Sequence, residues 1–455
     1  MMTRPPRLPS SGADVVNNSE RPPDGGLART LYGDIASGGT TAATGLSDAA
    51  FIARMVDVEE NLALAVGDAG LVDTTTASAT AQLIAEITFD SADLVALAEA
   101  SVAGGNPAIP LARRLKAAAT DSGLGVSAVH RGATSQDIID TALVLCLRDA
   151  GDAILATTGD LITDLAGLAR TYRATPVIGR TLGQQAVPTT FGVIAAGWVR
   201  QVAAASTRLR DVLADLPVQY GGAAGNLAAT APSGLSVHAA LARRLGLADS
   251  PVVWHTDRLP LVQVATALAA LAGSVRKIAG DVIVFSATEV GELRESTPGG
   301  SSAMPHKANP AAAIAADGYA RRTPALAATV LDCMDQRMQR ATGAWHAEWQ
   351  TVRDLAAATA GAVNRTRASI DGITVDTDAM RRNLALTDGA VLAEALGRYV
   401  PRGDIDRAVA DGTLGELMEQ AHRDHGFSTD PADHTGHAAD IVDAVLNDLK
   451  GTPHE

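Results

Sequence analysis

The fold class is decided by LPLVQVATALAALAGSVRKIAGDVIVFSATEVGELRE, residues 259–295. Wound as a helix, this stretch presents alanine, leucine and valine on more than one face. Such a helix must be buried, either inside a bundle or between subunits. Similar stretches occupy residues 138–149, 153–172, 191–213, 311–333 and 349–371. The sequence therefore predicts an all-α protein built around a central bundle of very long helices.

The composition agrees with a folded, helical chain. Of the 455 residues, 47% are hydrophobic and 19% are charged, which excludes a wholly disordered protein. Aromatic residues make up only 3%, and this scarcity favours packed helices over sheets.

The chain divides into four segments by composition. Residues 1–26 are rich in proline, serine, asparagine and glycine, and they are predicted to be a disordered tail. Residues 27–120 are expected to form an N-terminal helical domain. In it, one helix starts at a Ser47 cap and a second covers residues 78–103. Residues 121–370 form the central long-helix domain, and residues 371–455 a small helical C-terminal domain that begins with a cap at Asp376 or Thr377.

Charge and cysteine content narrow the partners and the compartment. The net charge of −14 argues against general binding to nucleic acid. Cys146 and Cys333 lie in apolar, helix-like stretches and are expected to be buried thiols in a reducing, cytoplasmic compartment. No apolar run reaches the length that spans a bilayer, and the first residues lack the apolar core of a secretory signal.

The loop TPGGSSAMPHKANP, residues 297–310, carries the clearest chemistry. Gly299 and Gly300 permit the backbone freedom of a mobile lid. A serine such as Ser301 becomes a strong base when a cation and backbone N–H groups stabilise its alkoxide. Lys307 supplies a cation and Asn309 an amide. The plainer alternative is a flexible surface loop.

A second segment, VHRGATSQDIIDTA at residues 129–142, predicts an anion site. Thr134 or Ser135 can cap the helix that follows, and the free N–H groups of a helix N-terminus attract anions. His130 and Arg131 add positive potential as possible anion contacts. The alternative is an ordinary capped helix.

A third segment, GRTLGQQAVPTTFG at residues 179–192, offers Gln184 and Gln185 as hydrogen-bonding groups for a substrate. Arg180 is interpreted as structural, with anion contact as the alternative. No cofactor or metal is expected. The glycines of residues 216–228 do not fit a dinucleotide fingerprint, and His434 and His437 have the spacing of a surface turn.

The stretch GSSAMPHKANP resembles the signature of the aspartase/fumarase superfamily, G-S-S-x-M-P-x-K-x-N-P. The resemblance implies three helical domains and a homotetramer whose merged central bundles share active sites among three subunits. It also implies that Ser301 is the base, that Lys307 and Asn309 bind the carboxylate beside the attacked carbon, and that Thr134 and Ser135 bind a carboxylate.

Two positions depart from the superfamily pattern. Ala308 stands where relatives often carry arginine, which leaves the choice of substrate open. Leu182 stands where relatives often carry a histidine that protonates the leaving group. A leaving group that departs as a stable anion does not need this proton.

Within the superfamily, the segments at 130–142 and 179–192 and the segment GAWHAEWQTVRDL at 343–355 most resemble bacterial 3-carboxy-cis,cis-muconate cycloisomerases. This implies a small polycarboxylate substrate and a lactonising reaction. The main alternative is β-elimination from a substituted succinate to give fumarate, as in nitrosuccinate lyases, which release nitrite in natural-product pathways. A non-catalytic relative and a nucleotide-binding module are disfavoured, because Ser301, Lys307 and Asn309 are intact and phosphate loops are absent.

Overall fold

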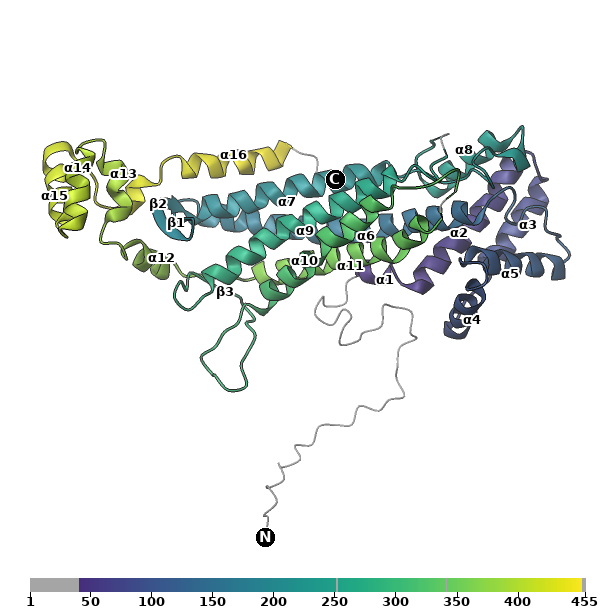
Figure 1. Cartoon of the computed structure of the whole chain (residues 1–455), viewed down its shortest axis with the longest axis horizontal. Helices are drawn as coiled ribbons and strands as arrows, with labels where there is room; N and C mark the ends of the chain where they lie inside the picture. Colours follow the sequence, from purple (N-terminus) through teal and green to yellow (C-terminus); the bar gives the residue numbers. More distant parts are fainter. Residues whose placement is uncertain (1–40, 251–252, 341, 452–455) are drawn as a thin grey trace, which may run out of the picture.

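Long parallel and antiparallel helices run the length of the molecule and form its central bundle (Figure 1). The computed structural model describes residues 41–250, 253–340 and 342–451. The bundle helices are α6 (Ser135–Thr171), α7 (Phe191–Ala214), α9 (Leu259–Phe285), α10 (Ala311–Asp332) and α11 (Ala344–Ile370). Their inward faces are buried and form one continuous apolar core, which confirms the predicted all-α class. The predicted tail at residues 1–26 lies outside the described residues.

One end of the bundle carries the short N-terminal helices. These are α1 (Thr41–Thr44), α2 (Asp48–Asp68), α3 (Thr74–Ala85), α4 (Ser91–Ser101) and α5 (Ala108–Asp121), with η1 (Ala228–Thr230) and α8 (Gly234–Leu245) beside them. Ser47 caps α2 as predicted, since its side chain accepts from the Ala50 N–H. The single helix expected over residues 78–103 is wrong. Asp90 forms a capping box with Asp93 and starts α4 as a separate helix.

The other end carries two short hairpins and the C-terminal helices. The strands are β1 (Pro176–Thr181), β2 (Gln184–Thr190), β3 (Leu293–Arg294) and β4 (Thr374–Val375); β1 pairs with β2 and β3 with β4, both antiparallel. The helices are α12 (Thr377–Leu384), η2 (Ala390–Leu392), α13 (Ala393–Leu396), α14 (Arg402–Ala410), α15 (Leu414–His425), η3 (Pro431–His434) and α16 (Ala438–Gly451). Asp376 caps α12 as predicted. A second apolar core lies among α12 to α15, and α16 returns along α7.

The bundle departs from the predicted helix limits in two places. The expected break at residues 150–152 does not occur, because α6 continues through Gly151 as one helix of 37 residues. The stretch at 259–295 is helical only to Phe285, after which the chain turns into β3. Apolar composition alone could not mark this end, because the residues that follow include the buried Leu293.

Gly151 allows α6 to approach α7 closely. A Cβ placed there would lie 2.3 Å from Leu213 Cδ1 of α7. Gly151→Ala is therefore expected to lower the free energy of unfolding by about 1–3 kcal/mol through overpacking. Denaturant unfolding measures this. The control is Gly415→Ala in α15, where an added Cβ meets nothing within 4 Å. An unchanged midpoint for Gly151→Ala would show that α6 and α7 separate easily.

Cys146 and Cys333 are both free thiols and both buried, as predicted. Burial raises the pKa of Cys146 to about 12, so this thiol stays protonated at neutral pH. Among the described residues, no helix has the length and the apolar character that crossing a membrane requires.

Candidate active site

The N-terminus of α6 is held by a buried carboxylate. Thr134 is the N-cap residue, and its N–H donates to Asp137 Oδ2 at 2.8 Å. Asp137 also accepts from the backbone N–H groups of Gly221 and Gly222, each at 2.9 Å. Its Oδ1 lies 2.7 Å from His255 Nε2. These contacts fix the loop that presents Thr134 and the half-buried Ser135, as the predicted capped helix requires.

Arg340 reaches the same point from the loop between α10 and α11. Its Nη1 donates to Thr134 Oγ1 at 2.5 Å. A guanidinium can only donate, so the Thr134 hydroxyl accepts here and keeps its own hydrogen for another acceptor. Sequence reasoning missed Arg340, because no local pattern marks a residue whose partner lies 206 positions away.

His130 and Arg131 enter the same end of the molecule. His130 Nδ1 lies 2.5 Å from Glu59 Oε1 of α2, while Arg131 is exposed. The Arg131 carbonyl accepts from the Tyr220 hydroxyl at 2.9 Å, which anchors the loop before Thr134. Arg340, Arg131 and His130 thus lie near the α6 N-terminus together with the carboxylates of Glu59 and Asp137.

Most of the segment at 179–192 belongs to the β1–β2 hairpin, and its last two residues begin α7. Leu182 and Gly183 form its turn with φ of 53° and 78°, and Leu182 is fully exposed. Gln184 is also exposed, whereas the Gln185 amide donates to the Asn383 carbonyl at 2.9 Å. Two positive φ values in a two-residue turn suit the twist of a tight hairpin.

Arg180 in this hairpin makes two parallel hydrogen bonds to Glu292, at 2.9 and 2.6 Å. Glu292 is fully buried, and it also accepts from the Asn383 side chain at 2.6 Å. The ion pair joins the hairpin to the strand that leads into the 297–310 loop. The Arg180 guanidinium is thus paired with a buried carboxylate.

The loop with Ser301 is a flap with a fixed neck and an exposed tip. Gly299 and Asn309 exchange two backbone hydrogen bonds of 2.8 and 2.9 Å across the neck. Glu295, just before the flap, accepts from the N–H groups of Ala312 and Ala313, just after it. The Glu295 carboxylate therefore caps the N-terminus of α10. The flap projects beside β3 (Figure 1).

Two backbone N–H groups point at the Ser301 hydroxyl. Those of Ala303 and Met304 donate to Ser301 Oγ at 3.4 and 3.1 Å. Donors in this position stabilise negative charge on the oxygen. Lys307 is exposed on the same tip, and the Asn309 side chain donates to the carbonyls of Gly299 and Gly300 at 3.1 and 3.2 Å.

The predicted site residues form two groups at opposite ends of the bundle. Thr134 precedes α6 and the hairpin follows it, and a helix of 37 residues spans about 55 Å at 1.5 Å per residue. Figure 1 shows the hairpin and the flap at the end opposite α2 and α8. One chain therefore places His130, Arg131, Thr134 and Ser135 at one end of the bundle. It places the hairpin with Arg180, Gln184 and Gln185, and the flap with Ser301, Lys307 and Asn309, at the other end (Figure 1).

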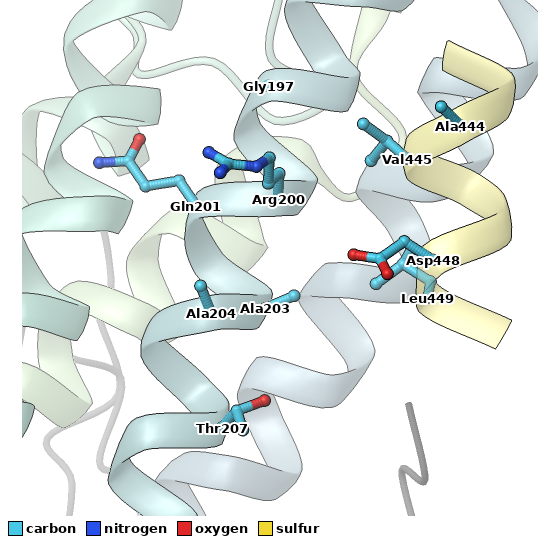
Figure 2. A pocket seen from close by; sticks show the side chains of 10 residues that line it. All are labelled: Gly197, Arg200, Gln201, Ala203, Ala204, Thr207, Ala444, Val445, Asp448 and Leu449. Carbon is cyan, nitrogen blue, oxygen red and sulfur yellow. The ribbon is translucent and has the colours of Figure 1, made fainter. Parts of the chain in front are cut away.

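A large groove elsewhere holds none of these residues. It has a volume of about 860 Å³ and lies between α7 and α16, with Arg200 and Gln201 on one side and Asp448 on the other (Figure 2). Its floor is made of small residues such as Gly197 and Ala204, and it lacks the groups that the predicted chemistry needs. Among the described residues, no cluster of three histidine, cysteine or acidic side chains could hold a metal ion.

Comparison with known proteins places the chain in a family. The model of the family described as Lyase matches residues 124–324. A nitrosuccinate lyase of Streptomyces davaonensis is 39% identical over 91% of this chain and 94% of its own length. A 3-carboxy-cis,cis-muconate cycloisomerase of Pseudomonas putida is 42% identical over 85% of this chain and 93% of its own length.

A solved structure shares the whole fold. The 3-carboxy-cis,cis-muconate lactonizing enzyme from Pseudomonas putida has a TM-score of 0.84 and 35% identity, with 92% of this chain and 99% of that chain covered. The fumarate lyase of Mesorhizobium sp. BNC1 has a TM-score of 0.78 and 30% identity over 89% of this chain and 97% of its own. The chain therefore belongs to the aspartase/fumarase superfamily of lyases and is an enzyme of that superfamily.

Proposed function

We propose that the protein moves a proton at the carbon α to a carboxylate of a small polycarboxylate: the proton is removed as a β-substituent leaves, or it is delivered as the substrate's own carboxylate adds at the β-carbon. Ser301 is the base in this proposal. The observation that carries it is the pair of backbone N–H groups that donate to Ser301 Oγ on the exposed flap. They stabilise the alkoxide, and Lys307 on the same tip adds a positive charge.

The α6 N-terminus is the proposed carboxylate site. The Thr134 hydroxyl must direct its hydrogen away from Arg340, which makes it a donor to a substrate oxygen. Ser135 adds a second hydroxyl, and the remaining guanidinium N–H groups of Arg340 suit a carboxylate. On the flap, Lys307 and Asn309 bind the carboxylate whose α-carbon is attacked, while Gln184 and Gln185 lie at the same end.

Arg340 is expected to contribute to substrate binding. Arg340→Gln should raise KM by about tenfold to a hundredfold, since a charge-assisted hydrogen bond contributes about 1.5–3 kcal/mol. The control is Arg337→Gln, which removes the same charge from the same loop. The Arg337 side chain is 75% exposed and pairs only distantly with Asp335, so KM should stay near that of the unmodified protein. If both variants raised KM equally, the cause would be the lost positive charge of the loop and not a contact between Arg340 and the substrate.

The separation of the two groups supports the proposed homotetramer, because it requires a site shared between chains. A catalytic centre needs the flap and the α6 N-terminus together, and one chain holds them at opposite ends of the helix bundle (Figure 1). Antiparallel packing of copies along their long helices would place one chain's flap beside another chain's α6 N-terminus. The proposal also includes domain boundaries at residues 120 and 370 and a reducing, cytoplasmic compartment.

The first candidate reaction is cycloisomerisation of 3-carboxy-cis,cis-muconate. It is supported by cycloisomerases that are 40% and 42% identical to this chain. In this reaction the substrate's own carboxylate is the β-substituent. It leaves or adds as an anion, which suits the exposed Leu182 at the hairpin turn, a side chain without a proton to give.

The second candidate is elimination of nitrite from nitrosuccinate to give fumarate. Two observations favour it: the match to a nitrosuccinate lyase over 91% of the chain, and Ala308 on the flap. Ala308 offers no cation, and a dicarboxylate requires fewer cationic contacts than a tricarboxylate. Nitrite is a weak base and also leaves without a proton.

One experiment decides between the candidates. The purified protein is incubated separately with 3-carboxy-cis,cis-muconate and with nitrosuccinate, while ultraviolet absorbance and nitrite are followed. Loss of muconate absorbance without nitrite release supports the first candidate, and nitrite with fumarate supports the second. Turnover of neither compound contradicts both candidate reactions.

A further inference from the structure

His130 is one of the residues whose role the proposed reaction leaves open. Its Nδ1 lies 2.5 Å from Glu59 Oε1, and the Glu59 side chain is fully buried. The His130 side chain is 15% exposed. The structure shows no hydrogen-bond partner for His130 Nε2 among the described residues. This atom is not completely buried, so a ligand can reach it. A carboxylate thus fixes one ring nitrogen, while the other remains accessible near the α6 N-terminus.

The surroundings favour a charged imidazole. Burial by itself would lower the pKa of His130, but the charge and the hydrogen bond of Glu59 raise it above its ordinary value. The other charged groups that face it are Lys116 of α5, which lowers the pKa, and Asp137 of α6, which raises it. The surrounding carboxylates therefore outweigh both burial and Lys116.

The backbone at His130 is held in a conformation that side chains other than glycine seldom adopt. Its φ is 54°, in the left-handed region. Such a conformation persists only where the surroundings impose it, and it is common at ligand-binding positions. Here the Tyr220 hydroxyl holds the next carbonyl, and Glu59 holds the ring, so the ring is aimed by contacts on both sides.

We propose that His130 is a catalytic residue whose imidazolium, oriented by Glu59, donates an Nε2–H hydrogen bond to the anion that leaves the β-carbon. This inference rests on the proposed function. In this inference, a group at the α6 end of the molecule stabilises the leaving group, because the Leu182 side chain cannot do so. Glu59 is a positioning residue, because it acts only through His130.

The step balances with the groups named. In the eliminating direction, Ser301 Oγ takes the proton from the α-carbon, and the electron pair of that C–H bond forms the double bond. The pair of the breaking β-bond departs with the leaving oxygen or nitrogen as an anion. In the lactonising direction, the carboxylate oxygen adds to the β-carbon, the pair of the double bond moves to the α-carbon, and the Ser301 hydroxyl gives its proton there. His130 donates a hydrogen bond and keeps its proton, so only Ser301 exchanges a proton with solvent between turnovers, releasing one after elimination and taking one up after lactonisation.

The test is the pH profile of kcat on whichever candidate substrate is turned over. In the unmodified protein, kcat should fall as pH rises through the pKa of His130, because only the imidazolium carries the charge. Glu59→Gln removes the charge that raises this pKa, so the falling limb should move to lower pH. His130→Gln keeps a neutral donor, so kcat should drop about 10²-fold and lose this limb, while KM changes less than about threefold.

His437→Gln is the control. His437 is also paired with a carboxylate, Asp440, but its side chain is 89% exposed at the start of α16, and its profile should match the unmodified protein. If the falling limb of the kcat profile remains in His130→Gln and does not move in Glu59→Gln, the inference is overturned while the proposed function stands. Should His130→Gln fail to fold, the Glu59→Gln profile decides alone. No turnover by the unmodified protein overturns both.

Discussion

Ser301→Ala is expected to lower kcat by about 10²- to 10⁴-fold, the usual contribution of a positioned proton acceptor. The substitution removes the oxygen that receives the Ala303 and Met304 N–H groups and leaves the flap backbone intact. KM should change little, because Lys307, Asn309 and the α6 N-terminus still bind the substrate. Steady-state kinetics and exchange of the α-hydrogen with solvent deuterium measure the loss.

The neighbouring hydroxyl gives the matched control. Ser302 is exposed on the same flap, and the structure shows no side-chain hydrogen bond for it among the described residues. Ser302→Ala should keep kcat within about threefold, because Ser302 is not the proposed base. Unchanged exchange of the α-hydrogen in Ser301→Ala would remove this serine from the mechanism.

Arg258→Met is expected to destabilise the protein by about 3–5 kcal/mol, the usual effect of breaking a buried ion pair. The guanidinium is completely buried between two carboxylates. It donates to Asp140 at 2.7 and 3.1 Å and to Glu348 at 2.6 and 2.9 Å. The variant leaves both acids in the core of the bundle without their cation.

The loss should be smaller in acid than in base. Burial raises the pKa of Glu348 to about 7 even with Arg258 beside it, and removing the cation raises it further. The folded variant then binds more protons than the unfolded chain, so its stability rises as pH falls towards 5. Denaturant unfolding at pH 5 and 8 tests this. The control is Arg321→Met, whose side chain is 61% exposed beside Asp317. A loss that does not depend on pH would contradict the account of this cluster.

The class of fold could be predicted because long alanine- and leucine-rich stretches have few ways to bury themselves. The places where prediction failed depend on tertiary contacts. Gly151 would usually weaken a helix, yet here it is required for the approach of Leu213. The break at Asp90 depends on a reciprocal cap of two acidic side chains, which apolar periodicity does not register.

The site was only partly accessible from sequence. The flap and the helix cap have local signatures, so Ser301 and Thr134 could be singled out in advance. Arg340, Glu59 and Glu292 could not be singled out, because the role of each depends on a contact with a residue 71 to 206 positions away. The hairpin was also missed, since the turn at Leu182 and Gly183 lacks the Asn-Gly or Asp-Gly signal that usually marks one.

Activity of a mixture of two impaired variants tests most directly whether different chains supply the two halves of the site. One variant is Ser301→Ala, and the other is Thr134→Val combined with Arg340→Gln. After the two are unfolded, mixed in equal amounts and refolded together, random assembly should restore about a quarter of the sites and hence of the original activity. Activity no higher than that of the separately refolded variants, although mixed oligomers form, would contradict the proposal that Ser301 of one chain acts on a substrate held by another.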